Sequence, residues 1–141
     1  MSNERFRTTR QKAVALDFLE AFWRADLDEA YAHLTSDAKF FVAPSGADVR
    51  EQDARSMLEF LVDKLFSRFH ENHPLKCEIT SMIQEHDVVA TEYVARAKTF
   101  RLEPYENYYS AHLVIEDHLV RSISTYGDTL YMKGLLSMQR G

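Results

Sequence analysis

The spacing of apolar residues along the chain changes at Leu75. Upstream of it, apolar residues recur every three or four positions, which is typical of helices with one buried face. They are Val14, Phe18, Leu19, Phe22 and Trp23 in a first segment, Leu27, Ala30, Tyr31 and Leu34 in a second, and Met57, Leu58, Leu61, Val62, Leu65, Phe66 and Phe69 in a third. Downstream, apolar and polar residues alternate, as they do in strands. The pattern predicts three helices followed by a sheet.

Capping signals set the expected starts of the three helices. The pairs with capping-box spacing are Thr8-x-x-Gln11, Asp26-x-x-Glu29 and Asp48-x-x-Glu51. Pro74 is expected to end the third helix. Between the second and third helices, Ala38–Val42 is predicted to be a short strand and Pro44-Ser45-Gly46 a turn.

Four strands are predicted in the second half of the chain, over Leu75–Gln84, Val88–Phe100, Tyr105–Ile115 and Leu119–Tyr126. Their short connections favour an antiparallel meander with helices on its inner face only. One face of the first strand is expected to carry Leu75, Cys77, Ile79, Ser81 and Ile83; the inward residues of the others are Val89, Thr91, Tyr93, Ala95 and Ala97, then Asn107, Tyr109, Ala111, Leu113 and Ile115, then Leu119, Arg121, Ile123 and Thr125. Leu130–Met138 is predicted to close one end as a short helix. The expected fold class is α+β, a curved antiparallel sheet wrapped around three N-terminal helices to form a cone.

Composition and charge indicate one soluble globular domain. The 141 residues are 45% hydrophobic with a net charge of −5, and the basic residues do not cluster as a nucleic-acid-binding face requires. No run approaches the roughly 20 apolar residues that span a membrane, and the polar N-terminus has no secretory signal. Cys77 is the sole cysteine, which favours a reducing compartment. We therefore expect a cytoplasmic protein that binds neither nucleic acid nor membranes.

Three short motifs, in their order and spacing, resemble a known family. They are Asp26-Leu27-Asp28, Leu34-Thr35-Ser36-Asp37-Ala38 and Tyr126-Gly127-Asp128. With the order helix–helix–strand–helix–four strands, residues 8–136 resemble the nuclear transport factor 2-like superfamily, in its SnoaL-like and ketosteroid isomerase-like branch. The resemblance implies a cystatin-like cone with a pocket between sheet and helices, forming a single domain over residues 8–138 after a flexible N-terminus of residues 1–7. It also implies a homodimer through the outer face of the sheet, with Glu92, Arg96, Ser110, His112, Ser122 and Ser124 at the contact.

The catalytic residues known in this superfamily are replaced in this sequence. Isomerases of the branch use a carboxylate base with a tyrosine and a protonated carboxylic acid as oxyanion donors. The matching positions are Phe18, Ala43 and Ala111, none of which can exchange a proton or donate a hydrogen bond. In members that resemble limonene epoxide hydrolase, an arginine and two aspartates act on water, and their positions here hold Tyr93, Ala95 and Thr125. Neither reaction is expected.

What remains on the inward face is an apolar wall with a few neutral polar groups, as in many small-molecule sites. The predicted ligand-binding residues are Tyr93, Tyr109, Thr125, Asn107, Phe18, Phe22, Ala111 and Ile123. The expected partner is a small apolar or aromatic molecule, and no cofactor is expected. The alternative interpretation is that these side chains simply fill the cone, since buried tyrosine hydroxyls readily find partners.

Titratable residues give only isolated candidates for acid–base chemistry. Asp128, Asp17 and His33 are the candidate catalytic residues, although Asp128 also suits a helix cap. His70 and His73 have the spacing of a metal pair but no third ligand, so no metal is expected. Three functions stay open: a small-molecule binder, an isomerase or polyketide cyclase-like enzyme with an unusual acid–base residue, and a dimeric interaction module with a filled core.

Overall fold

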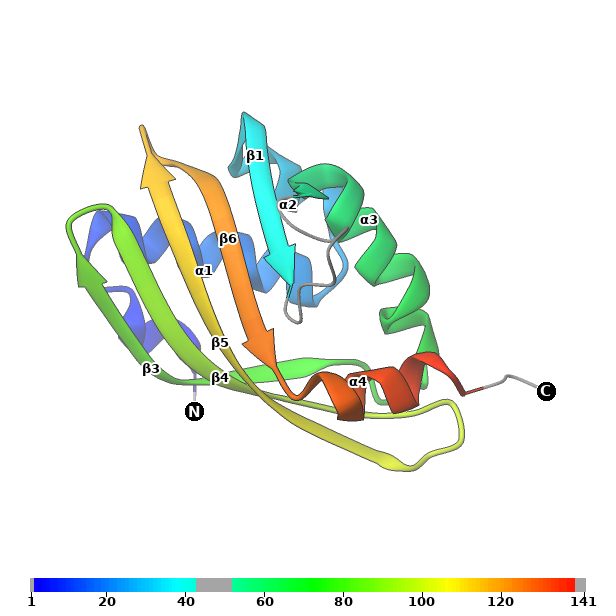
Figure 1. Cartoon of the computed structure of the whole chain (residues 1–141). Helices are drawn as coiled ribbons and strands as arrows, with labels where there is room; N and C mark the ends of the chain where they lie inside the picture. The colour runs from blue at the N-terminus through cyan, green and yellow to red at the C-terminus, as the bar shows by residue number, and fades with distance from the viewer. Residues whose placement is uncertain (1, 43–51, 139–141) are drawn as a thin grey trace.

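The computed structural model describes residues 2–42 and 52–138. In chain order the elements are η1 (Asn3–Phe6), α1 (Arg10–Trp23), α2 (Leu27–Ala32), β1 (Leu34–Val42), β2 (Gln52–Asp53), α3 (Ala54–Lys64), η2 (Phe66–Arg68), β3 (Lys76–Glu85), β4 (Val88–Lys98), β5 (Pro104–Glu116), β6 (Leu119–Gly127) and α4 (Thr129–Leu136). They form a strongly curved sheet with α1, α2 and α3 against its concave face (Figure 1). The α+β cone expected from the periodicity is confirmed.

The sheet is mixed, not antiparallel throughout. Its strand order is β2-β1-β6-β5-β4-β3, and β1 runs parallel to β6. Strands β3 to β6 form the antiparallel meander that the alternation predicts, but the prediction is wrong at the β1 edge, where β1 also begins at Leu34 and not at Ala38. Alternation tells which face a residue occupies and not which strand lies beside it, so the pairing of β1 left no local signal.

Side-chain caps start all three N-terminal helices. The Thr9 hydroxyl accepts a hydrogen bond from the Lys12 amide at the start of α1, one residue after the predicted cap. Asp26 caps α2 as predicted, and Asp53 caps α3. The predicted cap at Asp48 and the Pro44-Ser45-Gly46 turn lie outside the described residues. The third helix is shorter than its apolar pattern predicts. Helix α3 ends at Lys64, so Pro74 does not end it as predicted, and the chain continues as the 3-10 helix η2.

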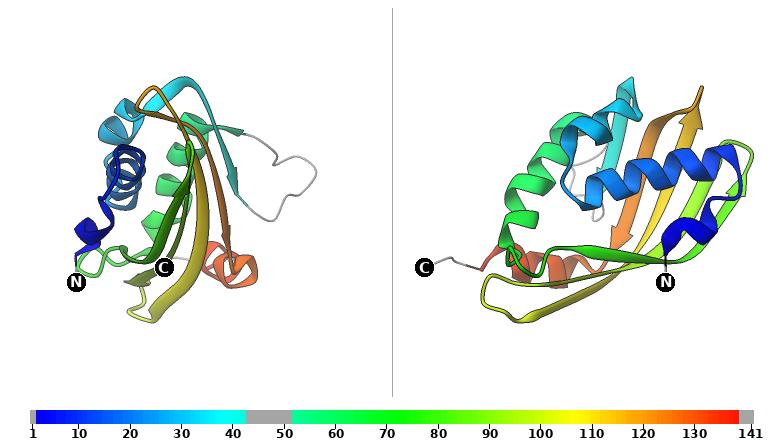
Figure 2. Two further views of the ribbon diagram at one scale, coloured as in Figure 1. Left: turned by 90° about the vertical axis from the view of Figure 1, so that its left-hand side faces the viewer. Right: turned by 180° about the vertical axis from the view of Figure 1, so that it is seen from behind.

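The helical layer lies on one side of the sheet, as Figure 2 shows. Helix α1 crosses the concave face and contacts β3, β4, β5 and β6. Its buried residues are Ala15, Leu16, Phe18, Leu19, Ala21, Phe22 and Trp23. Helix α3 packs on β1, and its Leu61 lines the same cavity as Tyr93 of β4, which confirms that both lie on the inner side. No helix in the described ranges has the length and apolar character needed to cross a membrane.

Two bulges change which residues face inward at the sheet margins. On β3 the register shifts between Ile79 and Ser81, so that Met82 is buried and Ile83 is exposed. On β5 and β6 the register shifts between Val114 and Ile115, which pair with Ser122 and Val120. Val120 is therefore buried, and Arg121 is left outside. The predicted inward position of Arg121 is wrong, and Ile83 does not share the buried face of Ile79, because an inserted residue reverses the alternation beyond it.

Helix α4 lies beside the part of β5 that pairs with β4 but extends past β6. Strand β6 ends its pairing at Gly127, opposite Tyr109, so residues 104–108 of β5 extend past it. Beyond that point Asp128 and Tyr131 contact β5 instead: the Asp128 amide donates to the Asn107 side chain, and the Tyr131 hydroxyl accepts from the Glu106 amide. Asp128 also caps α4. The short C-terminal helix predicted to close one end of the cone is confirmed.

The N-terminal arm is attached to the margin of the sheet. Asn3 of η1 donates through Nδ2 to the Cys77 carbonyl and accepts from the Ile79 amide. Arg7 forms an ion pair of 2.8 Å with Asp17 of α1. Residues 1–7 were expected to be flexible, and their flexibility stays a prediction, but these contacts give residues 3–7 a defined place beside β3.

Candidate functional site

The candidate site is a small cavity on the inner side of the sheet. It encloses about 40 Å³ between the end of α1, α3, η2 and the inner face of the sheet. Its walls are Phe22, Trp23, Phe40, Val42, Leu61, Leu65, Phe66, Phe69, Leu75, Cys77, Tyr93, Ala95, Tyr105, Tyr109, Thr125 and Met132. A single water needs about 10–15 Å³ measured in this way. The cavity therefore has room for a few atoms and not for a whole drug-sized molecule.

Aromatic residues make up half of the cavity wall, and their rings contact one another in two groups. Phe22 lies with its ring centroid 5.3 Å from Phe66 and 5.9 Å from Phe40. On the opposite side Tyr93 lies 4.7 Å from Trp23 and stacks on Tyr109 at 5.4 Å. Aromatic pairs at such distances stabilise their mutual arrangement beyond the effect of burial alone. The wall is therefore held rigidly from both the helical and the sheet side.

One polar group of this wall, the indole N–H of Trp23, has no hydrogen-bond partner among the described residues. Trp23 is the last residue of α1 and is only 7% exposed, yet its indole Nε1–H donates to nothing. The hydroxyl of Tyr93 lies near this indole N–H, which slightly favours the ionised form of the tyrosine. A buried donor without an acceptor is uncommon in folded proteins. The pair marks the polar end of the cavity.

A second polar cluster lies on β5, where three alternate side chains meet. The hydroxyls of Tyr105 and Tyr109 are 2.9 Å apart, and Asn107 Nδ2 lies 3.1 Å from each. The same amide group donates to the Asp128 carbonyl and accepts from the Asp128 N–H, both at 3.3 Å. With one donor and one acceptor, the Asn107 side chain bonds Asp128 as a neighbouring strand would. It therefore joins the cavity wall to the start of α4.

The Tyr109 ring lies so close to Gly127 that there is no room for a side chain at this position. A Cβ at this position would lie 2.6 Å from Cδ1 and Cε1 of Tyr109. Real Cβ atoms do not approach carbon so closely, so a side chain here would have to displace the Tyr109 ring. The glycine of the Tyr126-Gly127-Asp128 motif thus sets the position of one cavity wall.

No ionised group is among the described residues that line the cavity. Its titratable wall residues are Cys77, Tyr93, Tyr105 and Tyr109, and burial raises the pKa of all four above their ordinary values. For Tyr109 the neighbouring Tyr105 adds to the rise. All four are neutral at pH 7, because a raised pKa keeps the proton bound. The described wall can thus donate and accept hydrogen bonds, but it holds no general base at neutral pH.

The predicted ligand-binding residues fall into three groups. Tyr93, Tyr109, Thr125 and Phe22 line the cavity, and Asn107 holds Tyr109 from behind. Phe18, Ala111 and Ile123 are fully buried core residues that do not line it. Sequence reasoning missed Trp23, Tyr105, Cys77 and Met132, which do. Trp23 carried a signal as the only tryptophan, at the end of an apolar face.

None of the candidate acid–base residues reaches the cavity. Asp128 is exposed and caps α4 by accepting from the Tyr131 amide at 3.1 Å. Asp17 pairs with Arg7, and His33 bonds Glu29 through Nε2 at 3.0 Å. Of the positions matched to known enzymes, Tyr93, Ala95 and Thr125 line the cavity, whereas Ala43 lies outside the described residues. No group of three or more metal-ligating side chains occurs in the described part of the chain.

Residues 15–123 match the model of the SnoaL-like domain. The chain belongs to the SnoaL-like family. Among curated protein sequences, none matches it. The family and the superfamily resemblance read from the motifs are thus confirmed, and the SnoaL-like match lies within the 8–136 span.

Solved structures share the fold at low sequence identity. A protein assigned as a SnoaL-like polyketide cyclase from Jannaschia sp. CCS1 superposes with a TM-score of 0.72 at 13% identity, covering 93% of this chain and 94% of its own. TerC, crystallised with polyporic acid, gives 0.73 at 13% identity over 92% of this chain and 100% of its own. An epoxide hydrolase of Mycobacterium tuberculosis that resembles limonene epoxide hydrolase gives 0.65 at 17% identity over 92% and 91%. At such identities the similarity concerns the fold alone.

Proposed function

We propose that this SnoaL-like protein binds a small, uncharged, largely apolar or aromatic molecule in the cavity on the inner side of its sheet. The observation that carries the proposal is an aromatic wall that contains a buried indole N–H, that of Trp23, without a hydrogen-bond partner among the described residues. An apolar wall with a few fixed polar groups is the usual design of a small-molecule site. The crystal of TerC with polyporic acid supports the proposal, because the two proteins share this fold.

The absence of ionised groups from the described wall favours a neutral ligand. A carboxylate or ammonium group moved into this cavity would lose its hydration without gaining an opposite charge, which is strongly unfavourable. A neutral oxygen acceptor would instead complete the hydrogen bond that the indole of Trp23 lacks. The expected ligand therefore enters with a carbonyl or similar oxygen toward Trp23 and Tyr93.

Two measurements test this proposal. Native mass spectrometry of the purified protein should detect a co-purified small molecule or, with acetophenone added as a probe, a one-to-one complex. Tyr93→Phe keeps the ring and removes one hydroxyl, which should weaken acetophenone binding by about 0.5–1.5 kcal/mol, or roughly two- to twelvefold. Tyr108→Phe is the matched control, because Tyr108 is exposed on the outer face of the sheet. Equal binding by both variants and the wild type would rule out Tyr93 as a polar contact.

An isomerase or cyclase activity is the alternative. It would need a base from outside the described cavity wall, since Asp128, Asp17 and His33 are all engaged elsewhere. Any turnover found on an added ketone should then persist in Tyr93→Phe and disappear on replacing that base. We expect steroid isomerase and epoxide hydrolase activities at background.

We also propose that the protein is a cytoplasmic homodimer joined through the outer face of the sheet. Tyr108 and Tyr126 are exposed there, and Tyr126 lies beside His112 with ring centroids 6.3 Å apart. Exposed aromatic residues among small polar ones are typical of interface cores. The lone thiol of Cys77 favours the reducing cytoplasm. Sedimentation should show a dimer for the wild type and a monomer for Tyr126→Lys, and a wild-type monomer at micromolar concentration would refute it.

A further inference from the structure

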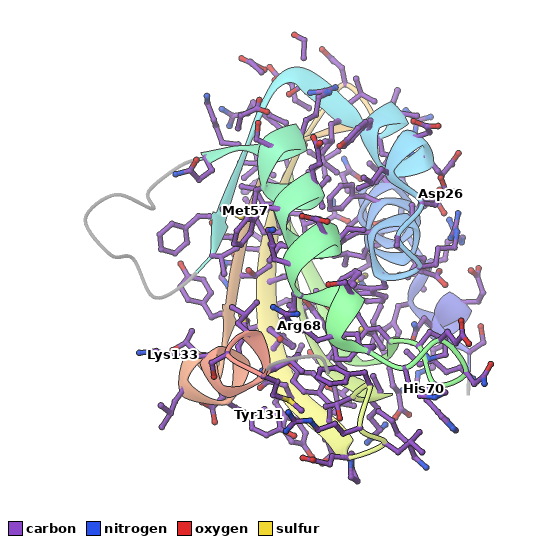
Figure 3. The ribbon with its side chains drawn as sticks, turned by 90° about the vertical axis from the view of Figure 1, so that its right-hand side faces the viewer. Asp26, Met57, Arg68, His70, Tyr131 and Lys133 are labelled. Atoms are coloured by element: carbon purple, nitrogen blue, oxygen red, sulfur yellow. The ribbon has the colours of Figure 1, made fainter. Side chains whose placement is uncertain are left out.

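An apolar groove adjoins the cavity on its outer side. The groove lies between α3 and α4 and has a volume of about 430 Å³. It shares Val42, Leu61, Leu65 and Met132 with the wall of the cavity. The two hollows therefore share part of their apolar wall. Figure 3 shows this face with α4 below and to the left of α3; Met57 is labelled on the left side of α3, and Lys133 extends outward from α4.

Two large apolar side chains in the walls of the groove are exposed to solvent. Phe60 on α3 is 51% exposed and Leu130 on α4 is 80% exposed, and both line the groove. Large apolar side chains gathered around a hollow are typical of binding sites, whereas single exposed ones are ordinary. Lys133 is the one charged residue among the described lining residues, so the groove favours apolar material along its length.

The volumes of the two hollows indicate which part of a ligand each of them can hold. Sites for drug-sized ligands usually measure about 300–1,000 Å³. The inner cavity of about 40 Å³ is far below that range, and the groove of about 430 Å³ is within it. The inner cavity has the polar groups, Trp23 and Tyr93, while the groove has the space.

We propose that cavity and groove form one continuous site, and that its ligand is an elongated lipophilic carbonyl compound. The carbonyl oxygen accepts from the indole N–H of Trp23 beside the Tyr93 hydroxyl, the adjoining atoms pass Leu61, Leu65 and Met132, and an alkyl or ring extension lies between Phe60 and Leu130. This inference rests on the proposed binding function and adds the length and polarity of the ligand. According to this proposal, Phe60 and Leu130 select for the length of the ligand, although neither lines the inner cavity.

A homologous series of probes tests the length selection. Dissociation constants of acetophenone and of 4-methyl-, 4-butyl- and 4-octylacetophenone would be measured by isothermal titration calorimetry. Affinity should rise by up to about fourfold for each methylene that enters the groove and level off once the groove is filled. Phe60→Gln and Leu130→Gln should reduce the gain in affinity with chain length, while the affinity for acetophenone itself stays unchanged. Ile83→Gln is the control, because Ile83 is 65% exposed on β3 and away from the groove.

The polar end is tested separately with Trp23→Phe, which keeps an aromatic ring and removes the N–H. It should weaken every member of the series by the same factor, about two- to twelvefold. If this loss is seen but affinity does not depend on chain length, the groove is not part of the site and the cone proposal stands. If no member binds, the proposed function itself fails. If affinity rises equally in the Phe60, Leu130 and Ile83 variants, the alkyl chains bind nonspecifically and the inference is overturned.

Discussion

Asn107→Ala should destabilise the protein far more than the loss of one amide implies. Asn107 is 2% exposed, and its side chain bonds Tyr105, Tyr109 and both main-chain groups of Asp128. After truncation the two tyrosine hydroxyls keep each other as partners. The Asp128 N–H and carbonyl lose theirs, and three heavy atoms leave a void in the core. Unsatisfied buried groups cost about 1–3 kcal/mol each, less where water can enter.

Together these effects should lower the free energy of unfolding by about 2–4 kcal/mol. Globular proteins unfold with an entropy of about 2.1 cal/mol/K per residue near the melting temperature, which for 141 residues is roughly 0.3 kcal/mol/K. The expected fall in melting temperature is therefore about 7–13 °C. Thermal unfolding followed by circular dichroism measures it. Hydrogen exchange should also become faster in α4, since Asn107 joins that helix to β5.

The matched control is Asn72→Ala. Asn72 is exposed in the turn before β3, and replacement of such a surface residue usually changes stability by less than about 0.5 kcal/mol. If Asn107→Ala lowered the melting temperature no more than Asn72→Ala, the amide network would not be stabilising the fold. A double-mutant cycle with Tyr109→Phe should give a coupling of about 0.5–3 kcal/mol, the range expected for residues in one hydrogen-bonded network.

Three further predictions concern the same region. Gly127→Ala should lower the melting temperature and alter the near-ultraviolet circular dichroism, because its Cβ would displace the Tyr109 ring; an unchanged spectrum would contradict this. Ala111→Leu should destabilise by about 1–3 kcal/mol and not fill a pocket, since Ala111 is fully buried and off the cavity; denaturant unfolding measures it, and a more stable variant would show unseen space there. Folding raises the pKa of Tyr93, Tyr105 and Tyr109, so their stabilisation is complete below about pH 10, the unfolded value, and declines above it as the unfolded chain loses protons. Absorbance at 295 nm should show these three tyrosines ionising only as the protein unfolds, and their earlier titration in the folded protein would contradict their burial.

The sequence predicted most of the elements because each rests on a local pattern. The apolar face of α1, the Asp26 cap and the alternation along β4 and β5 are all decided by neighbouring residues, and the structure has each of them. The predictions that failed concern features that depend on contacts between residues distant in the sequence. The bulge near Thr80 and the one before Ile115 reverse the alternation, and β1 pairs with a strand that follows much later in the chain.

The candidate site was predicted only in part for the same reason. Tyr93 and Tyr109 were placed toward the interior because their parity on two adjacent strands requires it, and both line the cavity. The spacing of apolar residues tells which face of a helix or strand is buried, but not how far along the cone a buried residue lies. Phe18, Ala111 and Ile123 were therefore placed in the pocket, although they belong to the packed core. Trp23 was assigned to the buried face of α1, and only the three-dimensional arrangement shows that its N–H has no acceptor.

The parallel pairing of β1 with β6 has a consequence for biosynthesis. Thr125 donates to the Phe41 carbonyl across 84 positions of the chain, so β1 cannot enter the sheet until β6 has been made. On the ribosome, the N-terminal helices and β1 emerge while the strands that cover their apolar side chains are still missing. Contacts between residues so distant in sequence form slowly, and exposed apolar surface favours aggregation in the meantime. Chains that stop before Leu119 should therefore be substrates for chaperones and proteases, whereas chains that include β6 can pair it with β1.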